Sequence, residues 1–185
     1  LPYTGDPDAD RLIATDPLAL LIGFALDQQI TLQKAFAGPR DLRERLGYLD
    51  AARIATTDPA RLDAVFRERP AIHRFPGAMA GKVQQLCAVI ADEYGNDAGR
   101  VWREAATGQD LRARLMALPG IGEMKARTIL AVLSKQLGVN PNNGLGDLYA
   151  KMVELDVPGL IHSASSCSER SLSRERPMAT DSFRG

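Results

Sequence analysis

The chain has 185 residues, which suits a single domain and is long enough to bury a hydrophobic core. Hydrophobic residues make up 45% of it and charged residues 25%, and 23 Lys and Arg balance 23 Asp and Glu. This balance excludes a globally basic nucleic-acid binder, but it leaves room for local basic patches.

Three helices are predicted in the first half of the chain. Asp16 followed by Pro17 marks the start of the first, because the carboxylate can cap free amides and proline at the first helical position loses no hydrogen bond. The Asp-Pro pair at positions 58 and 59 repeats this start, and apolar residues recur at helical spacing after both pairs. A third helix is predicted over about 78–94, where Gly95 ends it.

Shorter helical segments are predicted near 32–37, 40–46 and 101–105. Two further helices flank the stretch "LPGIG", one ending near Ala117 and the other beginning near Glu123. No segment alternates with a period of two for long enough to make a strand. The sequence therefore predicts an all-α fold up to about position 139.

After position 139 the composition changes. The turn-rich stretch "NPNNGLGD" comes first, and a Ser/Arg-rich end follows a candidate helix over 148–155. With few large apolar residues, this end can bury too little surface to offset the entropy of ordering. We therefore expect one helical domain over 1–160 and a disordered tail over 161–185.

The cysteines, Cys87 and Cys167, lie far apart in the sequence. They form neither a disulfide framework nor the close pair that begins a zinc or iron–sulfur site. The sequence also contains no run of about 18 apolar residues and no charged-then-apolar leader. We therefore expect no metal, no membrane partner and a location in the reducing cytoplasm.

The stretch "ALPGIGEMKART" interrupts what otherwise reads as continuous helix. Pro119 ends the first helix, and the glycines allow backbone angles that are closed to other residues. Gly120 and Gly122 have no side chains, so another backbone can approach them closely. The unpaired amides and positive dipole end of the next helix suit a phosphate.

Lys125 and Arg127 follow within the first turn or so of that helix. There they could add positive charge beside a DNA strand, in contacts that fix position without reading base sequence. The alternative from the local pattern alone is a plain helix–helix turn with a C-terminal glycine.

"LPGIG" followed by Ala126 and apolar residues at helical spacing resembles the helix-hairpin-helix of the HhH-GPD superfamily of DNA glycosylases, such as endonuclease III and the alkylation-base glycosylases. The resemblance spans about 12–139, with the helix-hairpin-helix over 109–137. It implies that the hairpin residues Gly120, Ile121 and Gly122 contact DNA.

"ALLIGFALDQQIT" resembles the buried N-terminal helix of the same superfamily, where an apolar run ends in a glutamine facing the DNA. Gln29 matches that position. A glycosylase must rotate its target base out of the stack, and a polar side chain can fill the vacated space. Without the resemblance, the favoured interpretation is that Gln28 and Gln29 are solvated residues at a helix end.

"RFPGAMAGKVQQLCAVI" is similar to the loop and helix with which the superfamily wedges open the duplex. Phe75 or Pro76 is the candidate wedge. The alternative for Phe75 is a core position. His73 has no partner that the sequence identifies, which favours a capping or packing role.

The sequence departs from the superfamily at the chemistry. Bifunctional members carry a lysine two residues after the second hairpin glycine, and this chain has Met124 there, so we expect no lyase activity. The superfamily's catalytic aspartate is matched by Asp147 in "GLGDLYAKM", for which an ordinary helix cap is the alternative. Four cluster-binding cysteines are also missing, so the resemblance is to a cluster-free member.

The resemblance implies a monomeric base excision repair protein that binds double-stranded DNA with a damaged base, at the nucleoid if the source is bacterial. Its implied activity is that of a monofunctional DNA N-glycosylase with Asp147 as the catalytic residue. A non-catalytic DNA-binding or scaffold protein is the alternative, which Met124 and the unusual C-terminal end favour. The sequence leaves open whether the chain is an enzyme.

Overall fold

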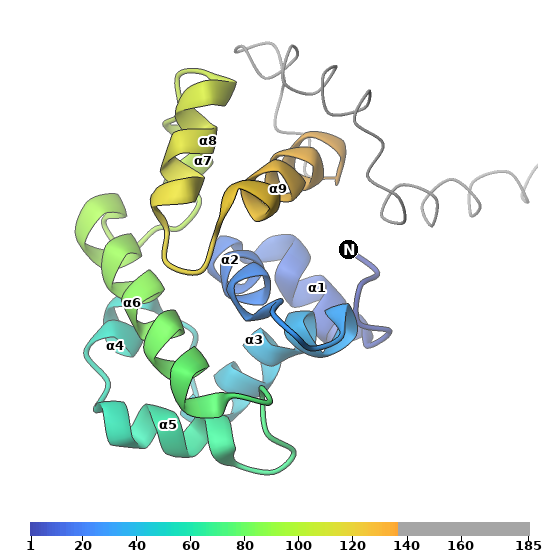
Figure 1. Ribbon diagram of the computed structural model, residues 1–185, viewed down its shortest axis with the longest axis vertical. Coiled ribbons are helices and arrows are strands. Elements are labelled where there is room, and N and C mark those ends of the chain that lie inside the picture. The colour runs from blue at the N-terminus through green and yellow to red at the C-terminus, as the bar shows by residue number, and fades with distance from the viewer. Residues whose placement is uncertain (137–185) are drawn as a thin grey trace, which may run out of the picture. The chain divides into compact units, whose positions relative to one another are not determined.

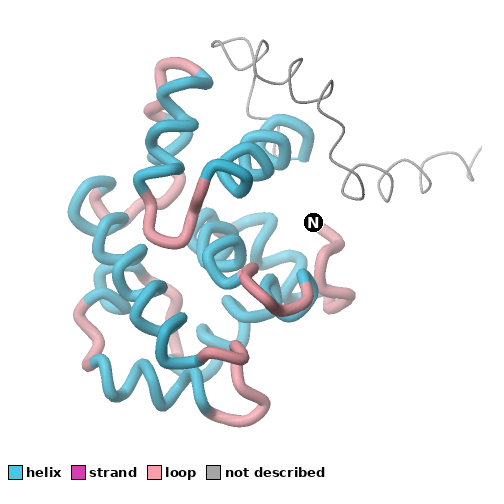
Figure 2. Tube along the Cα trace, viewed as in Figure 1, coloured by secondary structure: helices cyan, strands magenta, loops and turns pink. Residues whose placement is uncertain are grey.

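The computed structural model describes residues 1–136, and Figures 1 and 2 show that every regular element in this range is a helix. This confirms the all-α prediction for the described part. The helices are α1 (Pro7–Thr15), α2 (Pro17–Leu26), α3 (Leu32–Leu46), α4 (Ala51–Ala55), α5 (Pro59–Arg67), α6 (Pro76–Tyr94), α7 (Arg100–Arg103), α8 (Gly108–Ala117) and α9 (Glu123–Gln136). The proposed tail and the candidate catalytic residue Asp147 lie outside the described residues.

The helix starts follow the capping chemistry that the sequence predicts. The Asp16 carboxylate accepts hydrogen bonds from the amides of Leu18 and Ala19, and Pro17 takes the first helical position of α2. The Asp58 carboxylate caps α5 by accepting from the Arg61 amide, and Pro59 takes the first helical position. Helix α6 differs, because it begins after Phe75 with no side-chain cap.

Helix α2 is the centre of the core. Every residue from Leu18 to Leu26 is buried, so no face of this helix is left to solvent. Helices α1, α3 and α6 pack around it, and α4 and α5 pack against α6. The aromatic rings of Phe24 and Phe36 meet edge to face with centroids 4.9 Å apart, which joins α2 to α3.

Helix α3 corrects the prediction of two separate helices near 32–37 and 40–46. It runs through Pro39 without a break. Proline removes one backbone hydrogen bond, but Phe36 and Leu42 on either side are fully buried, and this packing outweighs the loss. Gly38 allows α3 to pack closely against α2, since an added Cβ would meet the Leu26 side chain.

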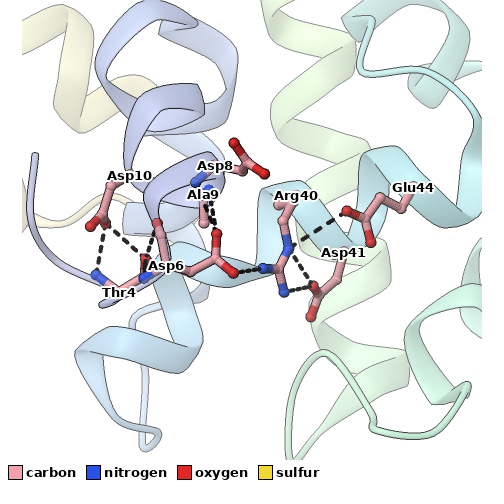
Figure 3. A network of polar contacts seen from close by, with 8 residues as sticks. All are labelled: Thr4, Asp6, Asp8, Ala9, Asp10, Arg40, Asp41 and Glu44. Carbon is pink, nitrogen blue, oxygen red and sulfur yellow. Dashed lines mark hydrogen bonds and ion pairs between the residues drawn. The ribbon is translucent and has the colours of Figure 1, made fainter.

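A polar network fastens the N-terminal segment to α1 and α3 (Figure 3). Arg40 of α3 donates to Asp6 and Asp41, while Asp6 also caps α1. The Asp10 carboxylate accepts from the backbone amides of Tyr3 and Thr4. The hydrogen bond from the Ala9 amide is the largest influence that lowers the pKa of Asp6.

Truncation of Phe36 tests how strongly the core depends on the packing between α2 and α3. We expect Phe36→Ala to lower the free energy of unfolding by about 3–5 kcal/mol, because it leaves a cavity beneath α2. Phe75→Ala is the matched control, since that ring is 44% exposed and its loss should cost less than about 1 kcal/mol. Urea titration followed by circular dichroism measures both, and equal losses would contradict the assignment of the two rings.

Candidate nucleic-acid interface

The connection between α8 and α9 is a tight hairpin. Leu118 leaves the helix in an extended conformation, and the Ile121 amide donates to the Leu118 carbonyl over 3.1 Å. The side chains of Leu118 and Ile121 are both buried. The Ile121 side chain therefore anchors the hairpin to the core. Neither this side chain nor the Ile121 amide is free to bind a ligand.

The two hairpin glycines have different roles. Gly120 has a φ of +87°, and an added Cβ would lie 2.9 Å from Cδ of Lys82 and 3.3 Å from Cβ of Ala25. Only glycine fits this backbone angle and this close approach to α6 and α2 (Figure 1). An added Cβ on Gly122 would meet nothing within 4 Å, so this position is open.

The N-terminus of α9 begins at this open glycine. The Gly122 carbonyl accepts from the Ala126 amide and so starts the helical ladder. The amides of the first turn have no intrahelical acceptor, and Gly122, which precedes them, has no side chain that could cap them. Backbone donors and the positive end of the helix dipole are therefore presented at the hairpin.

Three charged side chains flank this helix start. Glu123 binds both Arg112 of α8 and Arg127 of α9, the latter over 2.9 Å. The hydrogen bond from Arg112 is the main cause of the lowered pKa of Glu123. The group carries a net positive charge, because two guanidinium groups share one carboxylate. The sequence predicts Arg127 as a DNA contact, whereas no sequence pattern indicates Arg112, which pairs across the hairpin.

Lys125 is half-buried and turned back toward the hairpin. Its ammonium group donates to the Gly120 carbonyl over 3.2 Å. Burial is the largest influence on its pKa, which is lowered, while Asp27 acts in the opposite sense and Lys82 adds to the lowering. The neighbouring Met124 is 80% exposed. The thioether therefore faces solvent, and the amine beside it lies against the backbone.

Gln28 and Gln29, which follow the end of α2, have different surroundings. The Gln28 amide group donates to the Ala25 carbonyl over 2.8 Å, and its oxygen accepts from Lys82 over 3.1 Å. Gln29 is exposed and has a φ of +56°, an uncommon angle for a residue with a side chain. Gln28 is thus half-buried and held by these two hydrogen bonds, and Gln29 is the one that projects.

His73 has partners that the sequence did not reveal. Its Nε2 lies 2.9 Å from the Gln28 carbonyl oxygen, and its Nδ1 accepts from the Phe75 amide over 3.0 Å. The ring is fully buried. Since a backbone amide can only donate, Nδ1 carries no proton here, and Nε2 carries the proton of the neutral ring.

Phe75 is exposed, and its position at the end of the α5–α6 loop corrects the alternative of a core position. The guanidinium carbon of Arg74 lies 4.9 Å from the centre of the Phe75 ring. An exposed aromatic ring with a cation over it is available to a partner. The hairpin and Gln29 therefore lie at the end of α2. Phe75 is linked to the same place by the hydrogen bonds of His73.

Residues 1–136 show neither a candidate metal site nor a membrane-spanning helix. No group of three His, Cys, Asp or Glu side chains within residues 1–136 is arranged to hold a metal ion. The Cys87 thiol is buried, which raises its pKa to about 12 and leaves it unreactive. No helix in this part of the chain is long and apolar enough to cross a membrane.

Comparison with models of known protein families gives no match for this chain, and no curated protein matches it.

The buried His73 makes stability depend on pH. Burial is the main cause of its lowered pKa, so the unfolded chain binds a proton at His73 more readily than the native chain does. Stability should be fully present above the unfolded pKa of about 6.5 and should fall as pH drops through the native value. Thermal unfolding between pH 7.5 and 5.5 should show this loss, and His73→Asn should remove it. NMR titration of the ring provides a direct check, and a pKa at or above 6.5 would contradict the expectation.

Proposed function

We propose that this chain is a cluster-free member of the HhH-GPD superfamily that binds duplex DNA and removes a damaged base as a monofunctional N-glycosylase. The observation that carries the proposal is the open N-terminus of α9 at Gly122, on a hairpin that lies against the end of α2 from which Gln29 projects. Each of these features has a task in extracting a base from a duplex.

In this proposal the hairpin holds one backbone phosphate of the DNA. The first-turn amides of α9 point out of the helix, and Gly122 leaves room for a phosphate to approach them. The positive charge of Arg112 and Arg127 around Glu123 adds attraction. Such a contact positions the duplex and carries no sequence information.

Gln29 and Phe75 act on the base stack. Gln29 is exposed and free to enter the space that a flipped base leaves, where its amide can bond the orphaned partner base. Phe75 is exposed on the adjoining loop and can wedge between neighbouring bases. An inserted side chain offsets part of the cost of unstacking.

The chemistry proposed is hydrolysis of the glycosidic bond. Asp147 would stabilise the positive charge that develops on the sugar as the base departs, or activate the attacking water. A lyase step needs an amine that forms a Schiff base with the sugar. Met124 has no amine, and Lys125 is turned toward the Gly120 carbonyl, so we expect base release without strand cleavage.

A non-catalytic DNA-binding module is the second candidate. It is favoured by one observation: Met124, which is 80% exposed, stands where bifunctional members of the superfamily carry their nucleophilic lysine. In this case the hairpin, Gln29 and Phe75 bind DNA, and no base is released.

Substitution of Gly122 tests the phosphate contact. Gly122→Val should fold normally, because a Cβ there meets nothing, but it should weaken binding by about tenfold through loss of a charge-assisted contact. The loss should be equal for damaged and undamaged duplexes, measured by fluorescence anisotropy at low salt. Gln109→Val, at an exposed position of α8 outside the hairpin, is the control. A loss confined to one lesion would argue against a phosphate-holding role.

Base release tests the enzymatic proposal. The full chain is incubated with duplexes carrying alkylated, oxidised, deaminated or mismatched bases, and alkali then reveals abasic sites. We expect release on at least one substrate, and we expect Asp147→Asn to abolish it while duplex binding is kept. Binding without release on any lesion would favour the non-catalytic module, and no binding at low salt would exclude both.

A further inference from the structure

Lys82 of α6 connects the hairpin to the end of α2. Its side-chain carbons lie against Gly120, whose added Cβ would be 2.9 Å from Cδ and 3.3 Å from Cγ of Lys82. Its ammonium group donates to the side-chain oxygen of Gln28 over 3.1 Å. Within residues 1–136 it makes no ion pair with a carboxylate. This lysine is therefore directed into the protein rather than toward a ligand.

His73 connects the same glutamine to the α5–α6 loop. Its Nε2–H donates to the Gln28 carbonyl, and its Nδ1 accepts from the Phe75 amide. Both ring nitrogens are used, and the ring is buried. The position of Phe75 is thus fixed relative to Gln28 by two hydrogen bonds through one rigid ring.

The contacts form a continuous series from Gly120 through Lys82, Gln28 and His73 to Phe75. Gln28 is held at its side-chain oxygen, its side-chain nitrogen and its backbone carbonyl. Its neighbour Gln29 keeps a φ of +56°, an unfavourable angle for a residue with a side chain. Such an angle persists where the surrounding contacts hold it, and the three bonds to Gln28 fix the residue directly before it.

We propose that Lys82 and His73 are positioning residues, which hold the hairpin, Gln29 and Phe75 at one fixed spacing so that phosphate binding and gap filling occur together. The inference rests on the proposed DNA function, since the three segments are its DNA contacts. In this inference Lys82 and His73 touch no DNA themselves. Base flipping nevertheless depends on Lys82, because its side chain lies against Gly120 and bonds to Gln28. Pre-set spacing also avoids an ordering cost when the duplex binds.

The linkage can be tested first in the free protein. Lys82→Met keeps most of the side-chain carbons against Gly120 but removes the bond to Gln28. We expect the backbone amide resonances of Gly120, Gln29 and Phe75 to shift together in its NMR spectrum. Lys34→Met is the matched control, because it removes an equal charge from an exposed position of α3. Shifts confined to the neighbours of Lys82 on α6 would overturn the linkage.

The second test uses a duplex with a tetrahydrofuran abasic site opposite 2-aminopurine, a base whose fluorescence reports its stacking. The unmodified chain should bind and change this fluorescence as Gln29 enters the gap. In Lys82→Met the fluorescence change at saturating protein should fall by about tenfold, the effect of losing one hydrogen bond to a charged group. The affinity should fall no further than in Lys34→Met, and Lys82→Arg, which can still donate to Gln28, should restore the response.

The outcomes separate the two proposals. A normal fluorescence response in Lys82→Met, or a parallel loss of affinity and response in both lysine variants, would overturn the positioning role alone. Failure of the unmodified chain to bind the duplex would overturn the proposed function instead. If Lys82→Met does not fold, Gln28→Met breaks the same bond from the other side and is read against the same expectations.

Discussion

The complete burial of α2 is the constraint on which the rest of the described structure depends. A helix with no solvent-exposed face must be covered on every side, so α1, α3 and α6 are arranged around it. It also has to end abruptly, because an apolar helix cannot continue into solvent. Its end at Leu26 delivers three polar residues, Asp27, Gln28 and Gln29, to the place where the hairpin meets α6. The candidate interface is thus a consequence of how the core terminates.

The zero net charge is compatible with DNA binding because the charges are distributed unevenly. Arginines elsewhere pair with carboxylates, as Arg40 does with Asp6 and Asp41. Near the end of α2, Lys82 and Lys125 instead bond to an amide and a carbonyl oxygen, and neither forms an ion pair with a carboxylate in the described range. Arg112 binds Glu123 through two hydrogen bonds and Arg127 shares the same carboxylate, so in the proposed complex a phosphate would compete with Glu123 for the two guanidinium groups.

The sequence predicts local features well and long-range partners poorly. The start of α2 follows from Asp16 and Pro17 alone, because capping is settled within one turn. The continuity of α3 through Pro39 could not be read from the sequence, since it depends on packing against α2. The partner of His73 lies at Gln28, 45 positions away, and no periodicity links the two. The distinction between Gln28 and Gln29 has the same cause, because it is made by Lys82 on a distant helix.

The same reasoning limits what the hairpin can contribute to chemistry. Gly120 and Ile121 are fixed by packing, Met124 has no reactive group, and Lys125 donates to the hairpin's own carbonyl. Moving Lys125 toward a sugar would break that bond and expose its half-buried stem. A residue that stabilises the hairpin in this way is poorly placed to act also as a nucleophile. The hairpin residues therefore offer position and charge, and neither Met124 nor Lys125 is placed to act as a nucleophile.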